Sequence, residues 1–410
     1  MGMQLPKQGI PRDALFEDMR KRKEQDADWR GGRTFSLIYP ASEEVDGILA
    51  EANQLYMFEN ALNPFRFPSL RQMEVDVVSM VAGLLNAPEN ADGCMTSGGT
   101  ESILMAVMSA RNRARAERGV TEPELLAPVT AHPAFAKAAK YLGLQHRQIP
   151  IDADLRADLG AAERMIGAQT ALVVGSAPNY PFGTVDPIPE LAGLAAERGI
   201  SFHTDSCLGS FLLPFLERLG HPVPPFDFRV PGVTTMSADV HKYGYCTKGA
   251  SVVVHRDGAH LKQYQLFMYS DWPGGLYGSF SMAGARPAAP IAAAWAIMRY
   301  LGEDGYLRLA GDLLSTTSKI RSAIQATEGL RVIGDPVMSV FAFTSDGLEI
   351  GAIGDVMDDR GWHLDRQTNP AALHMMLSPK HGSVADRFIE DLREAVRKHG
   401  ATRGVEARYS

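Results

Sequence analysis

The sequence predicts an α/β fold with a mostly parallel central sheet and a smaller C-terminal α+β domain. Short apolar runs such as 170–174 and 251–254 alternate with alanine-rich segments of helical spacing such as 188–198, the pattern of strand–helix–strand units. After a long helix predicted at about 288–325, the pattern changes to short strands at 337–344 and two helices. A chain of 410 residues, 45% of them hydrophobic, is also long enough to form one large and one smaller domain.

These patterns divide the chain into three predicted parts. Residues 1–60 form an N-terminal arm of helices around the break at Gly31-Gly32, residues 61–305 form a large α/β domain, and residues 306–410 form a small α+β domain. Open α/β sheets bind ligands outside the carboxyl ends of their strands, so we look for functional residues at that edge of the sheet.

The first candidate element is a run of small residues, Ser97-Gly98-Gly99-Thr100, that leads into apolar residues at helical spacing. Small side chains let backbone N–H groups approach an anion, and the helix start adds the positive end of its dipole. The run therefore predicts a phosphate site. The alternative is an ordinary Gly-Gly turn capped by Thr100. The run matches neither the dinucleotide fingerprint nor the P-loop, so it does not indicate a nucleotide.

Two further candidates lie where predicted strands end. His132 leaves an apolar strand at a turn, where a flat imidazole can stack on an aromatic cofactor or act as an acid or base. Asp205 ends the strand predicted at 199–205, which directs its carboxylate into the ligand crevice, where it can pair with a protonated ring nitrogen. The alternatives are a core or cap histidine and a helix-capping aspartate.

The fourth candidate is Lys242, which stands beside His241 just after a short apolar run and just before Tyr243-Gly244. An amine attacks a carbonyl group only when its ammonium loses the proton often enough, which desolvation and neighbouring cations favour. A partly buried lysine at a strand end, close to a bound anion, meets these conditions. Taken alone, a lysine after a strand is more often a solvated loop residue.

Together, in chain order, these four elements are the parts of a pyridoxal 5'-phosphate (PLP) site. The Gly-Gly-Thr run holds the phosphate, Asp205 keeps the pyridine nitrogen protonated so that the ring acts as an electron sink, and Lys242 binds the aldehyde as a Schiff base. The conjunction is far more specific than any one element, and it predicts PLP as the cofactor.

Longer sequence words around these elements resemble those of the bacterial sphingosine-1-phosphate lyases, which are fold-type-I PLP enzymes related to group II decarboxylases. The matching words are NALNP at 60–64, TSGGTESILM at 96–105, PPFDFR at 224–229, HKYGY at 241–245 and DWPGGLY at 271–277. The similarity runs from about residue 33 to about residue 393. It implies an aspartate aminotransferase-like fold and a carbon–carbon lyase that splits a phosphorylated sphingoid base, by retro-aldol chemistry, into a fatty aldehyde and phosphoethanolamine.

The resemblance also implies roles for single residues. Those that bind the cofactor are Gly99, Thr100 and His241 at its phosphate, His132 on its ring, Asp205 at its ring nitrogen and Lys242 at its aldehyde. Ser279 reaches the phosphate from the second subunit of a homodimer with a shared active site. Tyr180 matches a tyrosine placed over the cofactor and is the candidate acid–base group alongside Lys242 and His132. The alternative for Tyr180 is a turn aromatic that packs on Pro181.

Three positions match those that bind the substrate phosphate in bacterial relatives, namely Tyr39, Asn63 and Lys248. Asn63 stands where a histidine is expected, and two further departures are Phe182 in place of histidine and Ala285 in place of serine. Losing a potential cation and a hydroxyl donor weakens binding of a doubly charged headgroup by roughly 1–3 kcal/mol per lost charge-assisted bond. Another phosphorylated, or even uncharged, amino alcohol therefore stays an alternative substrate.

The apolar tail of such a lipid could lie between subunits. Side chains that could line it are Met57, Phe58, Phe65 and Phe67. The alternative is that these four side chains make core or dimer contacts.

Two other functions remain open. An amino-acid decarboxylase would use the same cofactor, but it needs a cationic clamp for a side-chain acid or a pocket for an aromatic ring, and the sequence offers no obvious clamp. The second is a scaffold protein that has the fold but no catalytic activity, although Lys242, Asp205 and His132 are all present.

Charge and cysteine content exclude further classes. The net charge of −7 argues against a nucleic-acid partner, and the basic run at 111–118 is interpreted as a solvated helix face. Three cysteines without a C-x-x-C pair, Cys94, Cys207 and Cys246, favour a reducing compartment and no zinc site. All three lie beside cofactor motifs, so we expect oxidation to harm activity.

The chain has no apolar run of about eighteen residues and its N-terminal residues are charged. Eukaryotic members of the resembling family carry a membrane anchor. For this chain we expect no membrane anchor and a cytoplasmic location.

Overall fold

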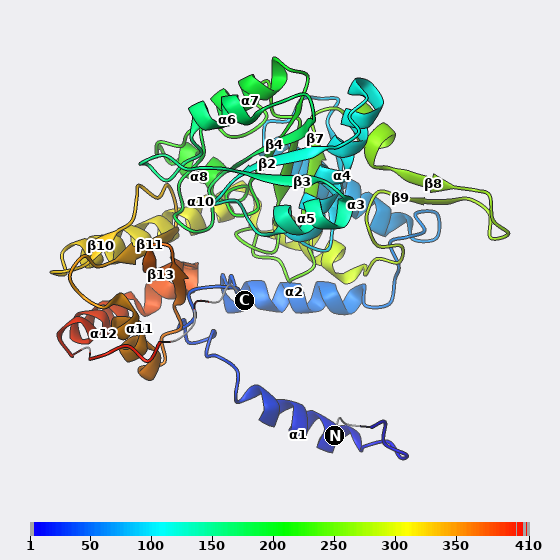
Figure 1. The fold of residues 1–410 in the computed structure, drawn as a ribbon. Coiled ribbons are helices and arrows are strands. Elements are labelled where there is room, and N and C mark those ends of the chain that lie inside the picture. The colour runs from blue at the N-terminus through cyan, green and yellow to red at the C-terminus, as the bar shows by residue number, and fades with distance from the viewer. Residues whose placement is uncertain (1–3, 399, 405–406, 408–410) are drawn as a thin grey trace.

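A seven-stranded sheet forms the centre of the molecule, with the strand order β1-β7-β6-β5-β4-β2-β3 (Figure 1). The structure is a computed structural model and describes residues 4–398, 400–404 and 407. The strands of this sheet are β1 Asp92–Thr96, β2 Glu124–Pro128, β3 Gln145–Ile149, β4 Thr170–Ser176, β5 Ser201–Asp205, β6 Thr235–Ala238 and β7 Ser251–His255. Its helices and a second, small antiparallel sheet confirm the predicted α/β fold class.

Neighbouring strands from β3 to β6 pair in parallel, whereas β7 pairs antiparallel with both β6 and β1. The apolar run at 251–254 was predicted as part of a parallel strand–helix–strand unit. The run does form a strand, but the predicted direction of that strand was wrong. No helix lies between β6 and β7, and adjacent strands joined without a crossover run antiparallel. The connecting loop, residues 239–250, carries Lys242.

Helices cover both faces of the sheet, which explains why its strands are apolar on both sides. On β4, Leu172 and Val174 pack in one core cluster with Phe135 of α5, whereas Val173 packs in the other cluster with Leu191 of α7. The helices up to this point of the chain are α1 Arg12–Lys23, α2 Glu43–Leu55, α3 Pro68–Leu84, α4 Gly99–Arg118, α5 Ala134–Leu142, α6 Leu159–Met165 and α7 Ile188–Ala196. They are followed by α8 Leu213–Arg218, α9 Gly258–His260 and the π-helix η1 Leu261–Gln265.

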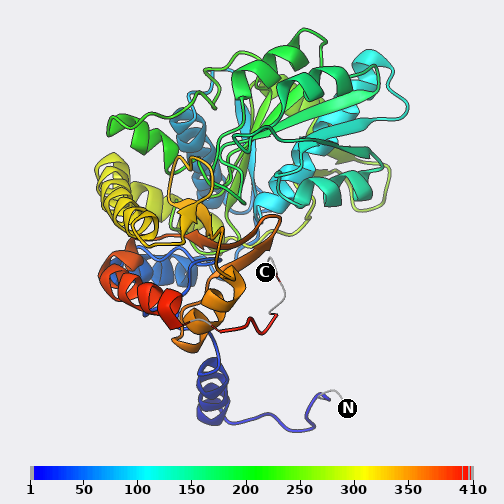
Figure 2. The same ribbon diagram turned by 60° about the vertical axis from the view of Figure 1, so that its left-hand side comes forward.

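The C-terminal part combines a four-stranded antiparallel sheet, of order β10-β11-β13-β12, with two α-helices and a 3-10 helix (Figure 2). Its strands are β10 Arg331–Val332, β11 Val340–Thr344, β12 Asp365–Thr368 and β13 Ala371–Met376, and its helices are α11 Ile350–Asp359, the 3-10 helix η2 Pro379–Ser383 and α12 Ala385–Lys398. The long helix α10, Ala289–Gln325, leads into this part and is interrupted at Gly302, where φ is 55° and ψ is −173°.

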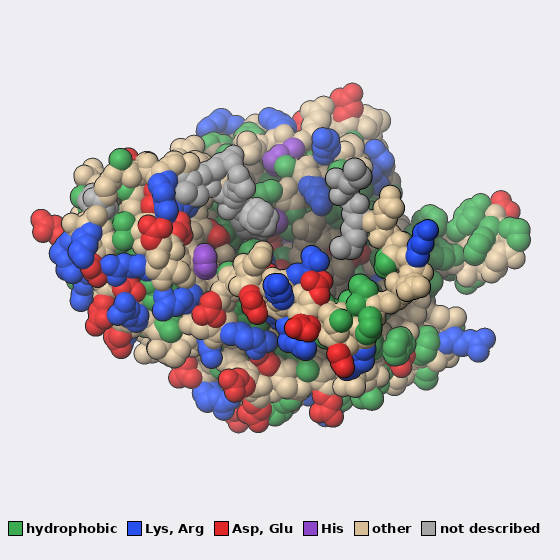
Figure 3. Space-filling model, turned by 90° about the horizontal axis from the view of Figure 1, so that it is seen from below, with side chains coloured by type: hydrophobic (Ala, Val, Ile, Leu, Met, Phe, Trp, Pro, Cys, Tyr) green, Lys and Arg blue, Asp and Glu red, His purple; other side chains and the backbone are tan. Residues whose placement is uncertain are grey.

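Two segments project from the body. Helix α1 buries none of its residues, and Figures 1 and 2 show it apart from both sheets. The hairpin of β8 Phe267–Tyr269 and β9 Tyr277–Ser279 projects elsewhere, and hydrophobic side chains gather on it (Figure 3). Its exposed apolar residues are Phe267, Met268, Tyr269, Trp272 and Leu276. None of the helices within the described ranges is long and apolar enough to cross a membrane.

Candidate active site

A cavity of about 300 Å³ lies where β4, β5 and β6 end. It brings together residues that are far apart in the sequence and that were predicted to form the site, namely Gly99, Thr100, His132, Tyr180, Asp205, His241 and Lys242. Strand direction explains the meeting, because β4, β5 and β6 are parallel and their carboxyl ends share one edge of the sheet.

The start of α4 forms one wall of the cavity. The helix begins at Gly99 after Gly98, whose φ is 154°, and no side chain of the N-cap residue caps its first turn. The alternative of a turn capped by Thr100 is therefore not what forms. A Cβ atom on Gly99 would lie 2.8 Å from both Asp239 Oδ2 and Cys207 Sγ, so only glycine fits this approach. Uncapped N–H groups at a helix start suit a phosphate.

His241 lies against this helix start. A Cβ atom on Gly98 would come within 3.4 Å of His241 Cε1. The Nδ1 atom of His241 is buried and makes no hydrogen bond to any of the described residues. A buried polar atom without a partner is costly, so this nitrogen and the uncapped helix start fit the phosphate group of PLP. Burial lowers the pKa of His241, although the carboxylate of Asp239 acts in the opposite direction.

Lys242 is paired with Asp239, a residue to which the sequence analysis gave no role. Lys242 Nζ lies 3.0 Å from Asp239 Oδ2, and His241 Nε2 lies 3.7 Å from the same oxygen. The Asp239 side chain is 1% exposed. Burial by itself raises the pKa of this carboxyl group, but the charges of Lys242 and His241 lower it overall. The only sign of this pair in the sequence is that Asp239 precedes Lys242 by three residues, a spacing at which a turn brings two side chains to one side.

Asp205 ends β5, as predicted, and lines the cavity. Its Oδ1 atom accepts hydrogen bonds from the Cys207 backbone N–H at 3.1 Å and from the Ser237 hydroxyl at 2.9 Å. Behind it, His203 Nε2 lies 3.2 Å from Ser237 Oγ and holds the hydroxyl in place. The carboxylate is thus oriented by β6 rather than used as a helix cap, since the next helix begins only at Leu213.

His132 and Tyr180 complete the lining. His132 Nδ1 accepts a hydrogen bond from the Ala134 backbone N–H at 3.1 Å, so the histidine supports the start of α5 and also faces the cavity. Burial lowers the pKa of His132 despite the nearby carboxylate of Asp205. The Tyr180 hydroxyl donates to Asp365 Oδ2 at 2.7 Å, so Tyr180 does more than pack on the proline that follows it.

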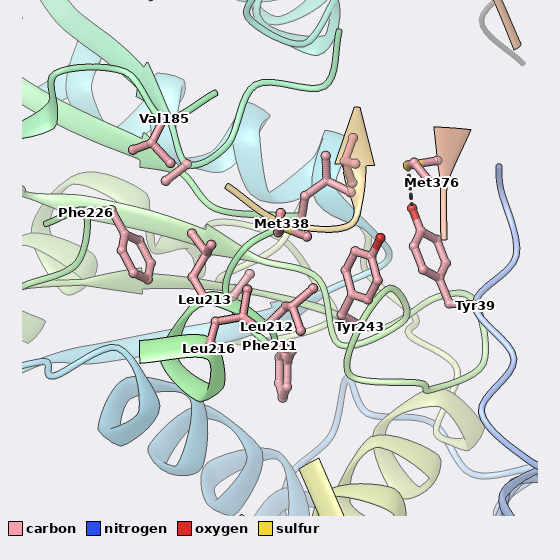
Figure 4. Close-up of a cluster of buried hydrophobic side chains, with 14 of the residues drawn as sticks. Tyr39, Val185, Phe211, Leu212, Leu213, Leu216, Phe226, Tyr243, Met338 and Met376 are labelled. Atoms are coloured by element: carbon pink, nitrogen blue, oxygen red, sulfur yellow. Dashed lines mark hydrogen bonds between the residues drawn. The ribbon is translucent and has the colours of Figure 1, made fainter. Parts of the chain in front are cut away.

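Other predicted residues do not line this cavity. Tyr39 is 8% exposed, and its hydroxyl donates to Met376 Sδ at 3.2 Å (Figure 4). Lys248 Nζ lies 4.8 Å from the centre of the Tyr39 ring and 3.4 Å from the His241 carbonyl oxygen. Although much of the Lys248 side chain is exposed, desolvation of its ammonium and the charge of Lys242 lower the pKa of Lys248 to about 8. The two residues form a separate pair behind His241.

Asn63 and Ser279 also lie outside the cavity formed by one chain. Asn63 is exposed, and its Oδ1 atom accepts from the backbone N–H groups of Phe65 and Arg66. Ser279 lies on the projecting hairpin, where its hydroxyl donates to the Ala283 carbonyl oxygen at 3.1 Å.

The other two sequence departures also lie outside the lining of this cavity. Phe182 is 3% exposed and packs with Ile333 and Ala342. Ala285 is exposed and does not line the cavity.

The cysteines are all buried and unpaired. Burial raises the pKa of Cys94 and of Cys246 to about 12 and also raises that of Cys207, which lines the cavity. Because the thiolate is the form that oxidants attack, the expected sensitivity to oxidation is disfavoured.

Comparison with known proteins places these residues in context. Residues 2–345 match the family model described as "Pyridoxal-dependent decarboxylase conserved domain". The sphingosine-1-phosphate lyase of Arabidopsis thaliana is 41% identical over 400 residues, which cover 96% of this chain and 73% of that protein. The enzyme of that name from Oryza sativa subsp. japonica is 40% identical over 401 residues, covering 96% and 74%.

Solved structures agree. The sphingosine-1-phosphate lyase of Burkholderia pseudomallei matches with a TM-score of 0.93 and 40% identity, covering 97% of this chain and 93% of that one. Glutamate decarboxylase from Lactobacillus brevis matches with a TM-score of 0.86 over 98% of this chain and 96% of its own. At 18% identity, that second likeness concerns the fold alone.

Proposed function

The chain belongs to the pyridoxal-dependent decarboxylase family and, within it, to the sphingosine-1-phosphate lyases, and from that premise we propose that it cleaves a phosphorylated sphingoid base. It is a PLP-dependent carbon–carbon lyase whose products are a fatty aldehyde and phosphoethanolamine. The observation that carries this function is identity of 40% and 41% to named lyases over 96% of the chain, together with a cavity that joins Lys242, Asp205 and an uncapped helix start.

The residues of the cavity fit PLP. The backbone at Gly99 and Thr100, together with His241 Nδ1, would hold the phosphate. The Asp205 carboxylate, oriented by Ser237, would pair with the ring nitrogen, and His132 would lie flat against the ring. Lys242 would bind the aldehyde covalently. When bound, PLP supplies the electron sink that makes the C2–C3 bond of the substrate breakable.

The reaction needs a group that takes the proton of the substrate 3-hydroxyl while C2–C3 breaks. Tyr180 is our candidate for this group, since it lines the cavity and its hydroxyl is held by a hydrogen bond to Asp365. Lys242, also in the cavity, is placed to return a proton to C2 of the product. His132 is the remaining acid–base candidate.

Recognition of the substrate phosphate would use Tyr39 and Lys248, which the structure pairs through the cation–ring contact. Asn63 would contribute no charge where a histidine is expected. We also propose a homodimer, because the projecting hairpin leaves large apolar side chains exposed and carries Ser279 away from its own cavity. In that dimer, Ser279 of the partner subunit would reach the cofactor phosphate. The exposed side chains Met57, Phe58 and Phe65 would lie at the same interface.

The proposal is tested with purified protein, PLP and sphingosine 1-phosphate. We expect a long-chain aldehyde, captured as a hydrazone, and phosphoethanolamine in equal amounts. Tyrosine and glutamate serve as control substrates. Release of carbon dioxide from either amino acid, with no aldehyde from the lipid, would instead support the decarboxylase alternative.

A further inference from the structure

Three parts of the chain meet at the carboxylate of Asp365, the first residue of β12. Its Oδ2 atom accepts the hydrogen bond of the Tyr180 hydroxyl at 2.7 Å, and its Oδ1 atom accepts that of the Ser36 hydroxyl at 3.0 Å. Tyr180 follows β4 of the central sheet, and Ser36 lies in the N-terminal segment before α2. Because each oxygen binds a different hydroxyl, the carboxylate is fixed in orientation as well as in position.

Tyr180 lies between two cavities. The first holds Lys242 and Asp205, and the second, of about 330 Å³, is lined by Asp365. Both cavities are also lined by Tyr180 and His132. Tyr180 is therefore shared by the two cavities, and its hydroxyl is bound by Asp365, which lines only the second of them.

We propose that Asp365 is the positioning residue and proton acceptor of Tyr180, an inference that rests on the proposed lyase function. A neutral phenol cannot take a proton from a substrate unless it gives up its own. Asp365 is the carboxylate that accepts the Tyr180 hydrogen bond, so the proton has a direct place to go. With its hydrogen directed at Asp365, the phenolic oxygen can act as the acceptor for the hydrogen of the substrate 3-hydroxyl.

The proton transfers balance over one turnover. As C2–C3 breaks, the 3-hydroxyl proton moves to Tyr180 and the Tyr180 proton moves to Asp365, while the C3–O bond becomes the aldehyde carbonyl. PLP, when bound, would supply the sink for the electron pair of C2–C3. The net reaction moves one proton from the 3-hydroxyl to C2, so the proton on Asp365 passes back through Tyr180 and replaces the proton that Lys242 gives to C2.

The surroundings of Asp365 support this role. Burial raises the pKa of Asp365, although the bonds from Tyr180 and Ser36 act against it, and a raised pKa makes the carboxylate a better proton acceptor. His374 faces Asp365 on β13 and donates through Nε2 to the Tyr180 carbonyl oxygen at 2.8 Å. Burial lowers the pKa of His374 to about 4, so this ring is neutral.

The charged neighbours are directed elsewhere. Arg366 follows Asp365 in the chain, but its guanidinium binds Asp358 Oδ2 at 2.6 Å and the Gly351 carbonyl oxygen at 2.7 Å. His132 lines the same cavity, and burial lowers its pKa. Within the described residues, no ion pair joins Asp365 to a cation that would oppose its protonation.

The test is Asp365→Asn in the PLP-loaded enzyme. The amide oxygen can still accept the Tyr180 hydrogen bond, but it cannot take the proton. We expect kcat to fall by about 100-fold, in the range typical of a lost proton transfer, with KM changed by less than about threefold and the acid limb of the kcat–pH profile displaced. The Asp365→Glu variant should recover part of kcat. The control is Asp346→Asn, which makes the same change in an exposed carboxylate paired with Arg331 and should keep kcat within about threefold of the wild type.

A second measurement does not depend on catalysis. Tyrosine labelled with carbon-13 at Cζ gives an NMR signal that reports the hydrogen bond of each phenol, and the Tyr180 signal is identified by its loss in Tyr180→Phe. We expect this signal to move in Asp365→Asn and to stay in place in the control Asp346→Asn.

The outcomes distinguish the role of Asp365 from the proposed lyase function. Unchanged kcat and pH profile in Asp365→Asn, in an enzyme whose wild type cleaves the lipid, would overturn the proton transfer from Tyr180 to Asp365. An unmoved Tyr180 signal would overturn the positioning role even in a protein that shows no lyase activity. Absence of cleavage in the wild type, with a moved signal, would overturn the proposed function and the proton transfer that rests on it. The positioning of Tyr180 by Asp365 would remain supported.

Discussion

Lys242 Nζ and Asp239 Oδ2 lie 3.0 Å apart in a site where the carboxylate is almost completely buried. The pair directs the Lys242 side chain before a carbonyl compound reaches it, because separating the two groups would leave a buried carboxylate without compensation. It therefore fixes the place of Lys242 in the cavity.

Replacing Lys242 with alanine should abolish the visible absorption that arises when PLP is bound to a lysine amine. The remaining cavity residues can still hold the cofactor without that bond. Absorbance spectra of the two dialysed proteins provide the measurement, with Lys319→Ala, a partly exposed lysine paired with Asp386 on the surface, as the control. A spectrum identical to that of the wild type would exclude Lys242 as the anchor.

Replacing Asp239 with asparagine should destabilise the cofactor-free protein. Breaking a buried pair by removing one partner costs about 3 kcal/mol. Since the folded-state pKa of Asp239 is lowered, its contribution is present above the ordinary value of 3.8 and is lost as the pH falls through the lowered value. Urea unfolding at neutral pH should show the loss, and the difference from the wild type should shrink below about pH 4. Equal stability at neutral pH would contradict the importance of the pair.

A methyl group on Gly99 should weaken cofactor binding. In Gly99→Ala the new Cβ atom meets Asp239 and Cys207 at 2.8 Å, so the start of α4 must shift away from its present place. We expect the Kd for PLP to rise by at least about tenfold, which is about 1.4 kcal/mol. Gly83→Ala, on α3 with nothing within 4 Å of the new atom, is the matched control. Equal PLP affinity for both variants would argue against a phosphate site at the start of α4.

Introducing a histidine at position 63 should improve binding of the phosphorylated lipid. If this position of the chain contributes to the headgroup site, Asn63→His adds one charge-assisted bond, worth roughly 1–3 kcal/mol. KM for sphingosine 1-phosphate should fall, whereas inhibition by unphosphorylated sphingosine should not change. A KM that stays constant would place Asn63 outside the headgroup site.

Charging the projecting hairpin should dissociate the proposed dimer. Leu276 is 69% exposed in the single chain. An aspartate in its place would be unfavourable when buried at an interface. Sedimentation of Leu276→Asp should give a monomer and show lower cofactor occupancy, because Ser279 would no longer reach the neighbouring site. The control is Leu219→Asp, which is exposed to 42% and lies far from the hairpin in the sequence. A wild-type protein that sediments as a monomer would refute the dimer directly.

The sequence was sufficient for the parts of the site that strand ends and helix starts determine. Asp205 and Gly99 could be predicted because a terminal carboxylate and a glycine before a helix have few other uses at the carboxyl edge of a sheet. Asp239 was missed because a carboxylate three residues before a lysine is also common in ordinary turns. Asp365 could not be found, since its contact with Tyr180 joins residues 185 positions apart.

Strand direction was also beyond the sequence. The apolar run of β7 has the same composition whether the strand runs parallel or antiparallel, and only the lack of a helix after β6 decides it. The burial of Phe182 was beyond the sequence for a related reason. The matching word gives only the residue type, whereas its packing against Ile333 and Ala342 joins segments far apart in the chain.

Ser36 and Tyr39 stand within one short stretch of the N-terminal segment, and each forms a bond to the C-terminal sheet, through Asp365 and Met376. Trimming or proteolytic nicking that removes the first forty residues would therefore disturb the chemistry of the enzyme, even though neither Ser36 nor Tyr39 lines the cavity that holds Lys242. Shortened versions prepared for crystallisation or immobilisation should begin before residue 33, because the carbonyl oxygen of Arg33 accepts a hydrogen bond from the His363 backbone N–H.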